Sequence, residues 1–340
     1  MVNLGVQGHA EYPRHIPVLL HDFINQLKPF SGVWVDGTFG DGGYSEILLK
    51  SEAKTVIAID RDPSVIASAS KLSKRFPTRF SFANERFSKL ADIVKSLGFK
   101  SVDGVLLDLG VSSMQIDQAN RGFSFQKKGP LDMRMSCTGL SAFDVVNSFS
   151  EKDLANIIYT FGEERFSRRI AKNIVQERKN KEIDSTETLT RLISNCFPKK
   201  NSFKTHPATR TFQALRIFVN NELEELVEGL EAAERILAPN GILAVITFHS
   251  LEDRIVKRFI KLKSGAYPKG NRHQPMQSKW KQSFEKFVKK EITASDAEVK
   301  LNSRARSAKL RIARKLRSEF SPIEKTLLGL PIINLEAQKR

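Results

Sequence analysis

Three acidic residues in the first third of the chain each end a run of apolar residues. Asp36 ends VWVD, Asp60 ends VIAID and Asp108 ends VLLD, and four glycines fall within residues 37–43. A carboxylate can accept hydrogen bonds from both hydroxyls of a ribose, and glycine lets a ligand approach the backbone closely. A single acid at a strand end is an ordinary cap, but three of them beside one glycine loop favour a site for a nucleotide-like ligand.

The glycine loop does not fit the common phosphate-binding patterns. In the pattern G-x-G-x-x-G, Gly40 and Gly42 supply the first two glycines, but the third position is Ser45. No Gly-Lys-Ser/Thr follows, which excludes a P-loop. Asp36 and Asp41 beside the loop would repel an anion. The loop therefore favours a ligand with a cationic or neutral centre, and S-adenosylmethionine is such a ligand.

Alternating strand-like and helix-like segments predict the frame that positions these residues. Strand-like runs occur in GVWVDGTF (32–39), KTVIAIDRDP (54–63), DGVLLDLGVSS (103–113) and GILAVITFHS (241–250). Helices are expected between them, over 45–52 and 64–76. This alternation is typical of an α/β fold with a parallel sheet and helices on both faces.

The middle of the chain does not continue this alternation of strand-like and helix-like segments. Residues 114–139 have no clear period and predict a long functional loop. Helix patterns follow over 150–161, 163–179 and 185–197 without strands between them, and one long amphipathic helix is expected over 212–237. We expect a sheet domain from 1–112 and 213–340, interrupted by an all-helical substrate-recognition domain over 113–212.

The net charge of +17 is concentrated near the end of the chain. Residues 254–317 contain 20 lysines or arginines and four acids. This imbalance favours a nucleic-acid partner over a merely solvated surface. The two cysteines, Cys137 and Cys196, form no Cys-x-x-Cys pair, and the first residues have no apolar signal-peptide core. We expect a cytoplasmic protein without a disulfide framework, a metal site or a membrane partner.

Several long blocks make the whole pattern similar to a known family. The sequence resembles the ribosomal small-subunit RNA methyltransferase H family, also known as MraW, from about residue 15 to 317. The blocks that carry the resemblance include DGTFGDGGYS (36–45), AIDRDP (58–63), DGVLLDLGVSS (103–113), GPLDMRM (129–135), GEERFSRRIA (162–171), HPATRTFQALRIFVNNEL (206–223), FHSLEDRIVKRF (248–259) and RARSAKLRIARK (304–315). The resemblance implies a Rossmann-like class I S-adenosylmethionine-dependent methyltransferase sheet.

The family methylates N4 of a cytidine in the decoding centre of 16S ribosomal RNA, and the resemblance implies this activity here. It also implies a set of cofactor contacts: Gly42, Gly43, Tyr44, Asp60, Phe87, Asp108 and Gln115. Tyr44 departs from the family, which often has histidine there, and this leaves a side-chain role for Tyr44 in question. Met114 and Ser303 stand where the family often has proline.

Methylation of an amine requires the amine to be oriented toward the methyl group. We expect Asp108, with the hydroxyls of Ser112 and Ser113, to accept hydrogen bonds from the amine without a covalent intermediate. His249 either lies near the acceptor base or only caps a helix, and the sequence leaves both open. We expect two sets of RNA contacts. One is an arginine-rich, helix-like segment suited to phosphates: Arg304, Arg306, Lys309, Arg311, Arg314 and Lys315. The other lies on the acceptor side: Arg121, Phe123, Phe125, Arg134, and His206 with Arg210, although Phe123 and Phe125 fit a core role equally well.

Two other functions compete with this hypothesis. A non-catalytic RNA-binding protein could keep a degenerate cofactor fold, although the intact acids and glycines speak against it. A nicotinamide-dependent dehydrogenase is disfavoured by the missing third glycine and by the basic C-terminal third. The sequence leaves open whether the protein forms a homodimer.

Overall fold

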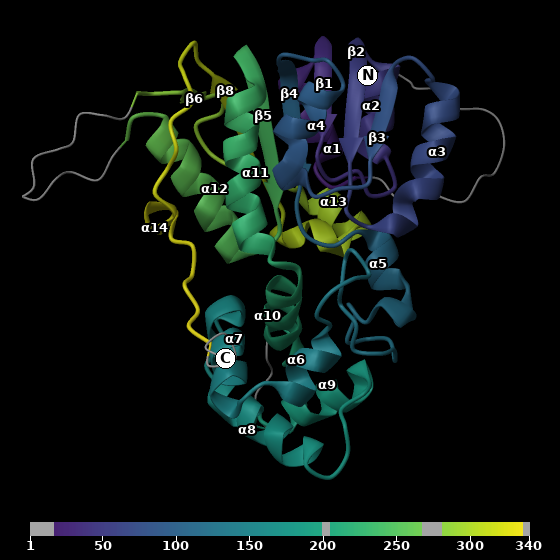
Figure 1. The fold of residues 1–340 in the computed structure, drawn as a ribbon, viewed down its shortest axis with the longest axis vertical. Coiled ribbons are helices and arrows are strands. Elements are labelled where there is room, and N and C mark those ends of the chain that lie inside the picture. Colours follow the sequence, from purple (N-terminus) through teal and green to yellow (C-terminus); the bar gives the residue numbers. More distant parts are fainter. Residues whose placement is uncertain (1–16, 199–204, 267–280, 336–340) are drawn as a thin grey trace, which may run out of the picture.

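A single mixed sheet forms the centre of the molecule. The computed structural model describes residues 17–198, 205–266 and 281–335. Its strand order is β3-β2-β1-β4-β5-β8-β6, with β7 paired to β8 (Figure 1). The strands are β1 Gly32–Asp36, β2 Ala53–Ile59, β3 Phe80–Ala83, β4 Val102–Asp108, β5 Leu237–Thr247, β6 Phe284–Lys286, β7 Ile292–Thr293 and β8 Lys309–Lys315. β1 to β5 are parallel, and β6, β7 and β8 pair antiparallel.

The parallel strands are buried on both faces, which explains their continuous apolar runs. Trp34 and Val35 of β1 point into different hydrophobic clusters, because successive side chains of a strand face opposite ways. One face is covered by α4 Leu90–Ser96, α11 Glu222–Ile236 and α12 Ser250–Lys263. The other is covered by α1 Leu20–Leu27, α2 Gly43–Lys50 and α3 Ile66–Arg75. The predicted α/β architecture and its four strands are confirmed.

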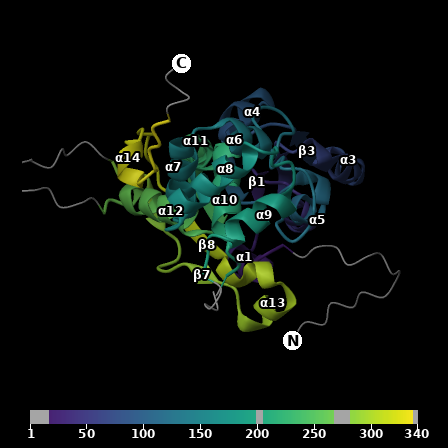
Figure 2. The same cartoon turned by 90° about the horizontal axis from the view of Figure 1, so that it is seen from below.

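A group of helices lies beyond the carboxyl ends of the strands (Figure 1). It consists of α6 Ala142–Ser148, α7 Glu151–Gly162, α8 Ser167–Arg178, α9 Thr186–Ser194 and α10 Ala208–Asn220. Seen from below, α8, α9 and α10 lie under the middle of the sheet (Figure 2). The three helices predicted over 150–197 are confirmed. Their buried residues, such as Ile157 and Ile170, join the same hydrophobic cluster as Val105 of the sheet.

The long helix predicted over 212–237 is wrong, because the structure has two helices there. α10 ends at Asn220, and Asn221 has φ 53°, in the left-handed region that asparagine tolerates better than most residues. α11 then begins at Glu222. The predicted domain boundary at residue 212 falls inside α10, which leads from the helical group to the sheet.

The helix-like segment predicted over 304–315 is also wrong. A short 3₁₀ helix, Ser303–Ser307, precedes strand β8, which pairs with β5 along one edge and with β6 and β7 along the other. In KLRIARK the apolar Leu310 and Ile312 alternate with cations, the period of a strand. Arg311 is paired with Asp253 (2.7 Å) and Lys315 is 3% exposed. The cations of β8 are therefore largely engaged within the protein.

Three short helices remain. α5 Ser113–Asp117 lies at the start of the predicted loop, and α13 Asp296–Leu301 and α14 Lys325–Leu328 lie in the C-terminal part. Within the described residues, no helix combines the length and the apolar character needed to cross a membrane.

Candidate active site

A cavity of about 450 Å³ lies at the carboxyl ends of β1, β2 and β4. This is the edge where ligands bind in open parallel sheets. Most of the predicted site residues line it: Gly43, Tyr44, Asp60, Phe87, Asp108, Ser112, Ser113 and Gln115. Gly42 belongs to the same loop but does not line the cavity.

The glycine loop has a backbone that other residues adopt poorly. Gly40 and Gly42 have φ of 54° and 81°, in the left-handed region. A Cβ on Gly42 would lie 2.7 Å from the ring of Phe39, and a Cβ on Gly43 would lie 2.5 Å from Pro17. At Gly40, by contrast, no atom comes nearer than 4.0 Å to such a Cβ. The loop is thus tightly packed against the protein at Gly42 and Gly43, and it has open space at Gly40, which lines the cavity.

Asp60 ties the end of β2 to this loop. Its Oδ2 accepts a hydrogen bond from the backbone N–H of Gly40 (2.8 Å), and its Oδ1 accepts one from the N–H of Asp62 (2.9 Å). Burial, with a smaller contribution from the charge of Asp62, raises the pKa of Asp60 to about 6. Each carboxylate oxygen keeps lone-pair capacity toward the cavity, as recognition of ribose hydroxyls requires.

Asp36 does not line the cavity. Its Oδ2 accepts a hydrogen bond from the hydroxyl of Ser45 (2.7 Å) and its Oδ1 accepts one from the N–H of Thr38 (3.3 Å). Burial raises its pKa to about 6. Asp36 is therefore a strand-end residue that shapes the glycine loop, and only two of the three acids face the ligand space.

Asp108 ends β4 on the cavity wall. Its backbone N–H donates to the hydroxyl of Thr38 (2.6 Å). Its Oδ1 is buried and has no hydrogen-bond partner. Burial, together with the charges of Asp36 and Glu252, raises the pKa of this carboxyl well above its usual range. A buried oxygen without a partner is uncommon, and this one lies on the cavity wall, where a donor group of a ligand can reach it.

Ser112 and Gln115 belong to a helix cap. The Ser112 hydroxyl accepts from the N–H of Gln115 (3.2 Å), and the Gln115 side chain accepts from the N–H of Ser112 (3.0 Å). The Gln115 amide also donates to Asp62 (2.7 Å). The side-chain oxygen and nitrogen of Gln115 thus both have partners within the protein. The cofactor contact that the resemblance implies for Gln115 is supported only by its position on the cavity wall.

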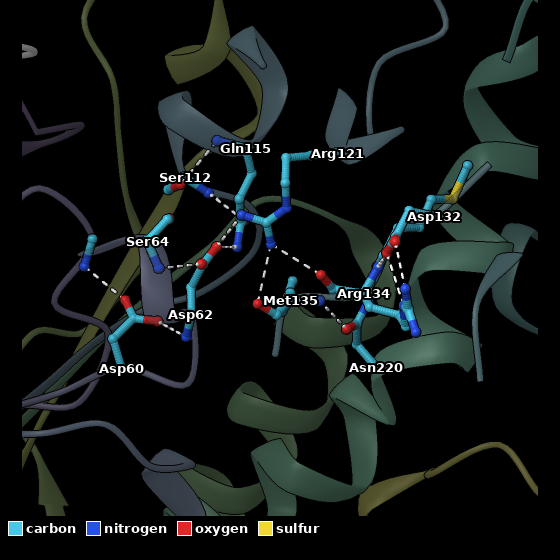
Figure 3. Close-up of polar contacts among 12 residues, drawn as sticks. Asp60, Asp62, Ser64, Ser112, Gln115, Arg121, Asp132, Arg134, Met135 and Asn220 are labelled. Atoms are coloured by element: carbon cyan, nitrogen blue, oxygen red, sulfur yellow. Dashed lines mark hydrogen bonds and ion pairs between the residues drawn. The ribbon is translucent and has the colours of Figure 1, made fainter. Parts of the chain in front are cut away.

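Asp62 anchors a buried network that the sequence did not indicate (Figure 3). Arg121 donates to Asp62 (2.8 Å) and to the carbonyls of Arg134 (2.9 Å) and Met135 (3.1 Å). Asn220 of α10 accepts from the N–H of Met135 (2.8 Å). This network joins the turn after β2, the long loop and α10, all of which border the cavity.

The expectation that Arg121 faces the acceptor RNA is therefore wrong. Its side chain is about 90% buried against Asp62, because a buried guanidinium needs a carboxylate and further acceptors. Arg134 pairs with its neighbour Asp132 (2.7 Å) and is partly exposed.

Three other predicted residues have clear partners. Ser113 accepts a hydrogen bond from Arg304 (2.6 Å), which also pairs with Asp117 (3.0 Å). The Tyr44 hydroxyl donates to the carbonyl of Val18, and burial raises the pKa of that hydroxyl. The Tyr44 side chain is therefore buried and packed within the protein, and Tyr44 is also one of the residues that line the cavity.

Phe87 is half-buried against α11. A Cβ on Gly229 of that helix would lie 2.4 Å from its ring, so the helix needs glycine for the ring to pack there. Because Phe87 also lines the cavity, one part of the ring lies against the protein and the rest borders the ligand space.

The sequence did not predict a second cluster of charged residues at the cavity. Arg216 of α10 forms a bidentate pair with Glu222 of α11 (both 2.8 Å), and Glu252 of α12 lies within 3.1 Å of His249. The break at Asn221 brings Arg216 and Glu222 together. Oxygen and nitrogen atoms of Glu222, His249 and Glu252 lie within 4.8 Å of one another. Arg216 already balances Glu222, so the arrangement gives no reason to assign a metal ion.

Comparison with known proteins decides the family. Residues 12–316 match the model of the MraW methylase family. The chain belongs to this family. It is 50% identical over 319 residues to a protein of Cereibacter sphaeroides named ribosomal RNA small subunit methyltransferase H, covering 94% of this chain and 95% of that protein. A protein of the same name from Rhodopseudomonas palustris is 52% identical over 308 residues, covering 90% and 92%. The dehydrogenase alternative is wrong.

The protein is thus a methyltransferase, and S-adenosylmethionine is the cofactor of its family. The cavity residues fit this group. Gly40 leaves open space beside the loop, Asp60 offers acceptors for hydroxyls, and Asp108 offers an unpartnered oxygen to a cation or an amine. When bound, the cofactor supplies a methyl group carried on a sulfonium.

Proposed function

We propose that the protein transfers this methyl group to the exocyclic N4 of a cytidine in the decoding centre of 16S ribosomal RNA. The names of its relatives support ribosomal RNA of the small subunit as the substrate. The single observation that supports an amine acceptor is the unpartnered Oδ1 of Asp108 on the cavity wall. The family resemblance supplies the cytidine and its position.

The N4 amine of cytosine is a weak nucleophile because its lone pair is delocalised into the ring. An acceptor oxygen that binds one N–H favours the more tetrahedral nitrogen of the transition state. The oxygen of Asp108 that has no partner among the described residues supports this role. We propose Asp108 as the group that orients the amine.

We assign positioning roles to the two serines. The hydroxyl of Ser112 caps α5, and the hydroxyl of Ser113 accepts from Arg304. Both keep the segment after β4 in place beside Asp108. The two cysteines of the chain have no part in the proposal, because Cys137 is exposed, Cys196 is buried, and neither lines the cavity.

The RNA reaches the cavity past a basic rim. Arg304 and Arg306 line the cavity from the 3₁₀ helix before β8. Arg306, the exposed one of the two, suits the phosphates that flank a target base, which must be unstacked to enter. We propose that the helical group α6–α10 contributes to recognition of the folded RNA and that the enzyme acts in the cytoplasm, where ribosomal subunits assemble.

A transfer assay tests the substrate. Purified protein and methyl-labelled S-adenosylmethionine are incubated with small subunits from cells that lack the enzyme, with free 16S RNA and with large subunits. We expect label only in 16S RNA, in the fragment that contains the decoding centre. Label in large-subunit RNA, or elsewhere in 16S RNA, would contradict the proposal.

The variant Asp108→Ala separates binding from transfer. We expect it to bind S-adenosylmethionine within about tenfold of the wild type and to lose methyl transfer by at least about 100-fold. Full activity of this variant would remove Asp108 from the proposal.

A further inference from the structure

Glu252 is a buried carboxylate on the cavity wall, and it has no part in orienting the amine, which is the role proposed for Asp108. It is 3% exposed and lines the cavity. Its Oε2 accepts hydrogen bonds from the backbone N–H groups of Phe248 (2.8 Å) and His249 (3.2 Å). Its Oε1 lies 3.1 Å from Nε2 of His249. These contacts hold the carboxylate in one orientation.

His249 does more than cap α12. Its Nδ1 accepts from the N–H of Glu252 (3.4 Å), which is the capping contact. Its Nε2 is buried without a hydrogen-bond partner and is the atom that faces Glu252. Serine, threonine, aspartate and asparagine are the preferred cap residues. Capping alone therefore explains neither the imidazole nor the position of its second nitrogen.

Charged groups from four elements surround Glu252: Asp108 of β4, Arg216 of α10, Glu222 of α11 and His249 before α12. Burial raises the pKa of Glu252, but His249 and Arg216 outweigh burial and hold it below its usual range. The pKa of Asp108 is raised, in part by Glu252. The lowered pKa keeps Glu252 ionised, so of these two cavity carboxyls it is the one that is ready to accept a proton.

The reaction under the proposed function releases a proton. The lone pair of N4 forms the new N–C bond, and the electron pair of the broken S–C bond stays on sulfur. N4 then carries a positive charge and both of its original protons, one of which must leave.

We propose that Glu252 is the acceptor of this proton and that His249 is a positioning residue that acts through Glu252. The proton moves from N4 to a carboxylate oxygen of Glu252, which leaves a neutral N-methyl amine and a neutral carboxylic acid. Solvent takes the proton from Glu252 before the next turnover. In this scheme Asp108 orients the amine before methyl transfer, and Glu252 accepts the proton that N4 loses afterwards. This inference rests on the proposed function, because it requires an amine as the methyl acceptor.

Single-turnover methyl transfer to small subunits, measured from pH 4 to 9, tests the proposal. The variants are Glu252→Gln and His249→Asn, and the second keeps a side-chain acceptor for the helix cap. We expect Glu252→Gln to slow transfer by at least about 100-fold. We expect His249→Asn to slow it about tenfold and to move the acidic limb of the pH profile to higher pH, because loss of the imidazole raises the pKa of Glu252.

Calorimetry with S-adenosylmethionine alone is the second measurement. Both variants are expected to bind the cofactor within about threefold of the wild type, since a proton acceptor acts after binding. If Glu252→Gln does not fold, the pH profile of His249→Asn decides.

A wild-type rate and pH profile in His249→Asn would reduce His249 to a cap, and a wild-type rate in Glu252→Gln would assign the proton elsewhere. If the wild-type protein forms no N4-methylcytidine, the proposed function fails and this inference fails with it. N4-methylcytidine formed at normal rates by both variants overturns the inference alone.

Discussion

At the scale of single residues, Gly42 and Gly98 form a matched pair. Their φ values are 81° and 84°, but a Cβ on Gly98 meets no atom within 4 Å, whereas a Cβ on Gly42 meets the ring of Phe39. Alanine at either position carries a similar backbone strain of about 1–2 kcal/mol.

We predict that Gly42→Ala weakens binding of S-adenosylmethionine at least about tenfold, because the glycine loop must shift, and that Gly98→Ala leaves it unchanged. Isothermal calorimetry measures both affinities. Equal affinities for the two variants would show that the loop does not hold the cofactor.

Asp36 makes stability depend on pH. Its pKa rises from an ordinary 3.8 to about 6 in the folded protein. A raised folded-state pKa means that stability is fully present below about pH 4 and is lost as pH rises through about 6, with a total near 3 kcal/mol. Asp36→Asn does not titrate. We predict that its stability relative to the wild type increases by roughly this amount from pH 4 to pH 8, measured by urea unfolding. A difference that does not change with pH would contradict the burial argument.

At the scale of elements, Arg121 connects the turn after β2 with the loop that carries Arg134 and Met135. Arg121→Ala leaves Asp62 buried without its charge partner, which costs about 3–5 kcal/mol. Arg134→Ala removes a partly exposed pair with Asp132 and is the control, with an expected loss within about 1 kcal/mol. Urea unfolding measures both. Similar losses for the two arginines would mean that the buried network does not join these elements.

The elements that the sequence predicted well are those with a strong local signal. β1, β2 and β4 are apolar runs that end in acids, and the helices over 150–197 have clear periods, as the apolar face of α7 shows. These signals also located Asp60 and Asp108, because the ends of parallel strands meet at one edge of the sheet.

The elements that the sequence missed depend on distant contacts. β8 is rich in cations, which conceal the alternation of its apolar residues, and its place in the sheet depends on its pairing with β5 and β6. The break at Asn221 is one residue long within a strongly helical pattern. Arg121 and Asp62 are 59 residues apart, so their pairing follows from the fold and not from local sequence.

At the scale of the whole molecule, the net charge of +17 overstates the free positive surface. Arg254 pairs with Glu163, Arg311 with Asp253, and Arg314 with Glu285. Arg306 is exposed at the rim of the cavity. The cations available to RNA are therefore a smaller set than composition suggests.

We predict that affinity for small subunits falls steeply with salt, and that Arg306→Ala lowers the slope of log K against log salt by about one. Arg311→Ala is the control, and it should lower stability but leave the slope unchanged. Filter binding at several salt concentrations measures the slopes. An unchanged slope for Arg306→Ala would place the phosphate contacts elsewhere.

The identity of the methylated atom tests the central claim most directly. Small subunits from cells that lack the enzyme are incubated with the protein and labelled S-adenosylmethionine, and the RNA is digested to nucleosides for mass spectrometry. The proposed cavity chemistry predicts labelled N4-methylcytidine as the product. Label in 5-methylcytidine, in a ribose 2′-O-methyl group or in another base would contradict the assignment of Asp108 and Glu252 to an amine acceptor.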